Sequence, residues 1–116
     1  MDVADRVVLI TGASSGVGAA LATQLGQMGA SVVVNYSRSA EAAEAVVEQI
    51  TGAGGQALAV QADVSEEADC KRLVATTVKQ FGQLDVLVNN AGTTTFVPHD
   101  QLDALTEDIW LRTLRV

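Results

Sequence analysis

Residues 11–18 of the chain read Thr11-Gly12-Ala13-Ser14-Ser15-Gly16-Val17-Gly18. They follow the apolar run Val7–Ile10 and precede a segment of helical periodicity, so they form a strand-to-helix turn with three glycines. Glycine adopts the positive φ angles that such a turn needs, and its missing side chain lets an anion approach the backbone. The first amides of the helix and its dipole attract that anion. The turn therefore predicts a diphosphate site, and a plain tight turn is the alternative.

Short apolar runs and helical segments alternate outward from this turn. The runs are continuously apolar, as buried parallel strands are: Val7–Ile10, Val32–Val34, Ala57–Val60 and Val86–Val88. Helices are expected from the glycine turn to Gly29, from Ser39 to Gly52 and from Ser65 to Gly82. Strands separated by whole helices must be parallel, with right-handed crossovers. The fold class predicted is α/β, a Rossmann-type doubly wound parallel sheet of about four strands.

The sequence also predicts the buried face of the first helix and the start of a last helix. The first is expected to bury one apolar face, made of Val17, Leu21, Leu25 and Met28. A last helix is expected to begin at Thr106, and the sequence offers no capping residue before the chain stops at Val116.

Composition excludes several classes of protein. The chain of 116 residues has 7 Lys and Arg against 14 Asp and Glu, so it lacks the basic excess that binds nucleic acid or anionic membranes. No apolar run approaches the roughly 20 residues of a membrane helix, and no signal peptide is recognisable. The lone cysteine, Cys70, cannot form an internal disulfide. We therefore expect a cytoplasmic location, with no nucleic-acid or membrane partner.

Two further motifs lie after strand ends, namely Asp63-Val64 after the third run and Asn89-Asn90-Ala91-Gly92 after the fourth. Together with the glycine turn, they resemble the T-G-x-x-x-G-x-G, acidic adenine-contacting and N-N-A-G motifs of the short-chain dehydrogenase/reductase family. Within that family the chain resembles the glucose dehydrogenase and 3-oxoacyl-carrier-protein reductase types. The resemblance implies cofactor contacts from these residues: Gly12, Ser14, Ser15, Gly16, Val17, Gly18, Asp63, Val64, Asn90, Ala91 and Gly92.

The residues alone support part of this assignment. In the usual strand order the fourth strand lies beside the first, at the switch point outside which ligands bind, so Asn90 and Gly92 should lie beside the glycine turn. Asn89 and Asn90 could equally satisfy backbone groups where two strands diverge. Asp63 could equally be an ordinary acid near a helix N-terminus.

The end of the second strand bears on the choice of cofactor. An NAD site usually has an acid about 20 residues beyond the glycines, but no acid occurs here between Gly18 and Glu41. Arg38 offers a planar cation to a 2′-phosphate, Ser37 a hydroxyl, and Tyr36 could flank the adenine. The sequence therefore favours NADP(H) and leaves NAD(H) possible, and a solvated surface arginine is the alternative.

Catalysis in this family uses a tyrosine and a lysine four residues later. The one tyrosine here, Tyr36, is followed four residues later by Ala40. We therefore expect residues 1–116 to be one NAD(P)-binding domain truncated before the catalytic half, with no catalytic residue and no metal site. Reduction of a carbonyl or oxidation of an alcohol substrate would need the missing half. A non-catalytic dinucleotide-binding module and an inactive fragment are the alternatives.

Truncation also carries an expectation about assembly. Val86–Val88 would be a bare apolar strand at the edge of the sheet. Such an edge pairs readily with another chain. We therefore expect a homo-oligomer or a complementary chain as partner.

Overall fold

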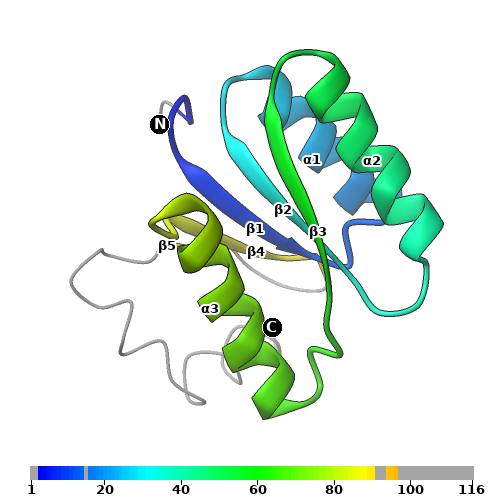
Figure 1. Cartoon of the computed structure of the whole chain (residues 1–116), viewed down its shortest axis with the longest axis vertical. Coiled ribbons are helices and arrows are strands. Elements are labelled where there is room, and N and C mark those ends of the chain that lie inside the picture. Colours follow the sequence, from blue (N-terminus) through cyan, green and yellow to red (C-terminus); the bar gives the residue numbers. More distant parts are fainter. Residues whose placement is uncertain (1–2, 15, 91–93, 97–116) are drawn as a thin grey trace.

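The computed structural model describes residues 3–14, 16–90 and 94–96 (Figure 1). Strands and helices alternate as the sequence predicts. In chain order they are β1 (Val7–Thr11), α1 (Gly16–Gln27), β2 (Ser31–Tyr36), α2 (Ala40–Gly52), β3 (Gln56–Gln61), α3 (Glu67–Phe81), β4 (Val86–Asn89) and β5 (Thr94–Phe96). The sheet order is β3-β2-β1-β4-β5, and the first four strands are parallel. The Rossmann-type α/β prediction is confirmed.

The parallel register brings the ends of four strands to one edge of the sheet. Thr11 pairs with Asn89 across β1 and β4, and Tyr36 pairs with Gln61 across β2 and β3. The strands can lie inside the molecule because they are apolar on both faces, and Leu9 and Ile10 of β1 are both fully buried. The carboxyl ends of β1 to β4 therefore form a common edge, at which ligands bind in wound sheets.

Helices cover both faces of the sheet. In Figure 1, α1 and α2 lie on one side of the sheet and α3 on the other. The side chains agree, because Val8 and Ile10 belong to the apolar cluster that includes Ala22 of α1 and Ile50 of α2. Leu9, which points the opposite way, packs in a second cluster with residues of α3.

The buried face of α1 differs from the prediction. Its buried residues are Gly18, Ala22 and Gly26, and the predicted Leu21 and Leu25 are partly buried against the same core. The predicted Val17 is 76% exposed, and Met28 is also exposed. The reason is size, because small residues spaced by four let the helix approach the rest of the fold closely. A Cβ on Gly26 would lie 2.7 Å from Ile50 of α2.

The other two helices follow the prediction closely. Helix α2 begins after Ser39, although the Ser39 side chain makes no capping hydrogen bond. Helix α3 begins after Glu66 rather than Ser65, because the Ser65 hydroxyl donates to the Asp63 carboxylate instead. Gly82 ends α3 with φ +83°, as its position in the sequence suggested.

The expectation that β4 would be a bare edge is wrong. Strand β5 pairs antiparallel with β4, and in the backbone register Val86, Leu87 and Val88 pair with Phe96, Thr95 and Thr94 respectively. Two threonines and a phenylalanine are residue types that favour strands, and they supply the missing partner. The argument for self-association through β4 therefore loses its basis.

Two further expectations concern helices. The helix expected from Thr106 lies outside the described residues. Within the described part of the chain, no helix combines the length and the apolar character needed to cross a membrane.

Candidate functional site

The glycine turn after β1 uses its three glycines for different reasons. Gly12 and Gly16 have φ angles of +60° and +61°, a conformation that other residues rarely adopt. A Cβ on Gly16 would meet nothing within 4 Å, so the backbone there is open to a ligand. Gly18 is needed for space, because its Cβ would lie 2.8 Å from the Gly12 carbonyl oxygen and 2.9 Å from Asn90 Nδ2.

The first amides of this turn are already occupied by β2. The Gly12 amide donates to Asn35 Oδ1 at 3.1 Å, and the Ala13 amide donates to the Asn35 carbonyl at 2.9 Å. A ligand at this edge would therefore meet the later amides, at the start of α1. Amides in the first turn of a helix have no partner within the helix.

Asn90 joins the end of β4 to the same turn. Its Nδ2 donates to the Gly12 carbonyl at 3.2 Å, and its backbone amide donates to the Thr11 hydroxyl at 3.2 Å. The Thr11 hydroxyl in turn lies 3.3 Å from Asn89 Oδ1. The predicted position of Asn90 beside the glycine turn is confirmed. The alternative role holds as well, because the Asn90 side chain satisfies the Gly12 carbonyl and the Thr11 hydroxyl satisfies the Asn90 amide.

The ends of β2 and β3 form the other side of the edge. The Ala62 amide donates to the Tyr36 carbonyl at 3.0 Å, and Gln61 Nε2 donates to the Ser37 carbonyl at 3.3 Å. Ser37 and Arg38 are exposed just beyond β2. The Arg38 charge contributes to lowering the pKa of Asp63, so Arg38 and Asp63 belong to one electrostatic neighbourhood.

Asp63 lies exposed in the short loop between β3 and α3. Its carboxylate accepts hydrogen bonds from the Ser65 hydroxyl at 2.6 Å and the Ser65 amide at 3.0 Å. These bonds hold the pKa of Asp63 below its ordinary value, and the charge of Arg38 adds a smaller effect. The Asp63 amide donates to Asp69 Oδ2 at 2.8 Å. Asp63 is therefore a fixed, ionised acceptor at this edge.

The remaining predicted site residues fall into two groups. The first group is described by the structure. At the start of α1, Ser14 is half-buried and Val17 is exposed. After β3, Val64 is half-buried, and its carbonyl accepts a hydrogen bond from the Cys70 thiol at 3.2 Å. Ser15, Ala91 and Gly92 lie outside the described residues.

The sequence analysis missed two residues that hold this edge together. Asn35 binds the glycine turn through its side chain and its backbone, and Thr11 joins that turn to Asn89 and Asn90. A threonine at the start of the glycine motif was visible in the sequence. A lone asparagine at the end of a strand gave no comparable signal.

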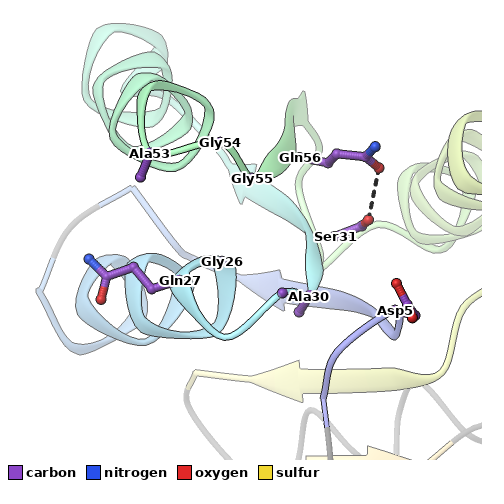
Figure 2. A pocket seen from close by; sticks show the side chains of 10 residues that line it. Asp5, Gly26, Gln27, Ala30, Ser31, Ala53, Gly54, Gly55 and Gln56 are labelled. Atoms are coloured by element: carbon purple, nitrogen blue, oxygen red, sulfur yellow. Dashed lines mark hydrogen bonds between the residues drawn. The ribbon is translucent and has the colours of Figure 1, made fainter.

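Two hollows are lined by described residues, and one of them reaches the glycine turn through Ser14. Figure 2 shows one of about 400 Å³ between the turns after α1 and α2, lined by Gly26, Gly54 and Gly55 among others. Ser31 and Gln56 at the starts of β2 and β3 also line it, and their side chains are hydrogen-bonded at 3.1 Å. This hollow lies at the amino ends of the strands, opposite the glycine turn. A second hollow of about 540 Å³ lies over α1 and α2.

Residues for covalent or metal chemistry do not gather at the described edge. Tyr36 has Ala40 four positions later, and both lysines of the chain, Lys71 and Lys79, lie within the bounds of α3. In the ranges 3–14, 16–90 and 94–96, no group of three or more His, Cys, Asp or Glu side chains is placed to hold a metal ion.

Comparison with known proteins agrees with this arrangement. The family model described as short chain dehydrogenase matches residues 6–116. The chain belongs to the short-chain dehydrogenase family and carries the cofactor-binding region of these oxidoreductases.

Individual relatives differ in length. The chain is 47% identical to the short-chain dehydrogenase/reductase homolog YusS of Bacillus subtilis over 109 residues, which is 94% of this chain and 100% of that protein. It is 53% identical to versicolorin reductase 1 of Aspergillus parasiticus, over 78% of this chain and 35% of that protein. Apart from YusS, the chain spans 35% to 42% of these curated relatives.

Solved structures show the same fold. One is a Burkholderia cenocepacia protein whose crystal structure contains bound NADP. It is 32% identical to this chain, with a TM-score of 0.72, and the match covers 76% of this chain and 34% of that one.

Proposed function

We propose that this chain is the NADP(H)-binding part of a short-chain oxidoreductase, with NAD(H) as a weaker ligand. The observation that carries the proposal is the contact of Asn90 with the Gly12 carbonyl at 3.2 Å, which joins two family motifs at the carboxyl edge of the sheet. That edge is where dinucleotides bind in wound sheets.

The diphosphate would lie over the start of α1. Gly16 leaves its backbone open, and the amides of Gly16, Val17 and Gly18 lie at the positive end of the helix dipole. The hydroxyls of Ser14 and Ser15 are expected to donate to phosphate oxygens. Ala91 and Gly92 complete the proposed set beside Asn90.

The adenosine would lie over the ends of β2 and β3. Asp63 and Val64 are expected to contact the adenine ring, and Tyr36 to flank it. Arg38 and Ser37 are exposed where a 2′-phosphate would be held, and a guanidinium binds phosphate through two parallel hydrogen bonds. The bound NADP of the Burkholderia cenocepacia relative supports this choice of cofactor.

The nicotinamide of the cofactor would supply a hydride to a carbonyl carbon, or accept one from an alcohol. Such a reaction also needs a group that moves a proton at the substrate oxygen, and the one tyrosine here lacks a lysine four positions later. Residues outside this sequence would have to supply that group. The absence of this pair from the 116 residues favours, as a second candidate, a dinucleotide-binding module without catalysis.

Replacing Arg38 by alanine tests the proposed site. We expect Arg38→Ala to weaken NADPH binding by about 10- to 100-fold, the value of a charge-assisted pair, and NADH binding by less than about twofold. Arg6→Ala is the matched control, because it removes the same charge beside Asp85 at the opposite end of β1. Isothermal titration calorimetry gives each affinity. Equal weakening of NADPH binding by the two variants would overturn the proposal, and so would failure of the unaltered chain to bind either cofactor.

A further inference from the structure

Asn35 is a buried polar residue that no motif of the sequence analysis includes. It lies near the end of β2, and only 2% of its surface is exposed. Burying an amide side chain is unfavourable unless its oxygen and nitrogen both find partners. Both do so here, and the partners belong to two different parts of the carboxyl edge.

The oxygen side of Asn35 holds the glycine turn. Asn35 Oδ1 accepts the Gly12 amide at 3.1 Å, and the Asn35 carbonyl accepts the Ala13 amide at 2.9 Å. Two consecutive amides of the turn are thus bound to one residue. The start of the turn, where Gly12 has a positive φ angle, is fixed relative to β2.

The nitrogen side of Asn35 holds the end of β3. Asn35 Nδ2 donates to the Ala62 carbonyl at 3.2 Å and to the Val60 carbonyl at 3.3 Å. It also lies 3.4 Å from the Tyr36 carbonyl. Ala62 directly precedes Asp63, so the same side chain fixes the strand end that leads into the proposed adenine wall, Asp63 and Val64.

The chemistry of the side chain suits this position. An amide accepts a hydrogen bond at one atom and donates two at the other, which matches one amide on the turn, the Val60 carbonyl of β3 and the Ala62 carbonyl just beyond β3. A carboxylate would face those carbonyls without a proton to donate, and an aliphatic side chain would leave all three groups without this partner.

We propose that Asn35 is a positioning residue that sets the separation between the diphosphate turn and the adenine wall. This inference rests on the proposed function, and it concerns which ligands bind more tightly because Asn35 fixes the turn relative to the wall. A dinucleotide spans the turn and the wall, so its affinity depends on their relative placement. The mononucleotide 2′-AMP reaches only the wall and Arg38, so its affinity does not. Preorganising two subsites favours the ligand that occupies both.

Calorimetric titration of the whole chain with NADP⁺ and with 2′-AMP tests the proposal. For Asn35→Ala we expect NADP⁺ binding to weaken by about tenfold or more, as for lost buried hydrogen bonds, with 2′-AMP binding changed by less than about twofold. Asn35→Ser is the second variant, in case the alanine variant does not fold. Thr77→Ala is the control, because it removes another buried side-chain hydrogen bond, within α3, and should leave both affinities unchanged.

A measurement on the unaltered chain needs no variant. Saturating NADP⁺ should slow hydrogen exchange of the Gly12 amide by about tenfold or more, whereas saturating 2′-AMP, which contacts only the wall, should change it by less than about twofold. Equal weakening of the binding of both ligands by the Asn35 variants, or equal slowing of Gly12 amide exchange by NADP⁺ and by 2′-AMP, would overturn the proposal. Failure of the unaltered chain to bind NADP⁺ would instead overturn the proposed function.

Discussion

Asp63 shows how a single exposed carboxyl group can be fixed without burial. Its carboxylate is bound by the hydroxyl and the amide of Ser65, and both bonds favour the ionised form. Its backbone amide is bound by Asp69 in the first turn of α3. The loop between β3 and α3 therefore presents an acceptor of defined direction at the carboxyl edge.

The pKa of Asp63 gives a test of this arrangement. Removing the hydroxyl in Ser65→Ala should raise that pKa toward its ordinary value of about 3.9. A carboxyl group whose pKa is lower in the folded state than in the unfolded state stabilises the fold at pH values above the unfolded-state pKa. This stabilisation is lost as the pH falls through the folded-state pKa. The variant should therefore lose less stability than the unaltered chain when the pH falls below about 4.

Carboxyl carbon shifts followed by NMR during an acid titration give the pKa directly. Ser39→Ala is the matched control, because the Ser39 side chain makes no capping hydrogen bond and lies before α2. An Asp63 pKa that is identical in the Ser65 variant and the unaltered chain would show that these bonds do not determine it.

Asn35 shows where residue-by-residue reading of a sequence fails. Its burial results from contacts with Val60 and Ala62, which lie 25 and 27 positions further along the chain. Nothing local marks such a residue, because asparagine at a strand end is ordinarily solvated or part of a turn. The glycines and Asn90, in contrast, could be predicted, because their roles follow from backbone conformation and strand order.

Helix α1 has small residues at its most buried positions, and Leu21 and Leu25 pack beside them. Its buried positions, Gly18, Ala22 and Gly26, are spaced by four and form one stripe. The sequence analysis assigned the buried face by hydrophobicity. It was right for Leu21 and Leu25, which pack against the core, and wrong for Val17 and Met28, which are exposed. The buried residues of α2 and α3 include larger apolar side chains, such as Ile50 and Leu73.

Gly18→Ala tests the close packing of α1 against the glycine turn. The added Cβ would lie 2.8 Å from a backbone oxygen and 2.9 Å from Asn90 Nδ2, so the turn must shift. Overpacking of this kind costs about 1–3 kcal/mol in the free energy of unfolding, measured by urea denaturation. Gly52→Ala is the control. Its Cβ would meet nothing within 4 Å at the end of α2, so we expect unchanged or slightly greater stability. Equal stability of the two variants would contradict this account of α1.

Strand β5 escaped prediction for a different reason. Three residues are too few to show a strand periodicity, so the run Thr94–Phe96 carried no signal. The four parallel strands could be predicted, because continuous runs of β-branched and aliphatic residues between helices have few other interpretations. The sheet is therefore bounded by β3 on one side and β5 on the other in the described part of the chain.

The sheet as a unit separates two very different edges. The carboxyl edge collects the glycine turn, Asn90, Arg38 and Asp63, whereas the amino edge holds the hollow of about 400 Å³ shown in Figure 2. The hollow of about 400 Å³ is thus not where the family motifs meet. Strand order and helix dipoles, rather than cavity size, argue for the carboxyl edge.

An NMR titration of the isotope-labelled chain with NADP⁺ tests this choice of edge most directly. Binding at the carboxyl edge predicts saturable shifts of the backbone amides of Gly16, Gly18, Asp63 and Asn90, with the Gly54 amide of the opposite hollow unchanged. Shifts confined to Gly54 and its neighbours, or no saturable shift at any amide, would contradict the account.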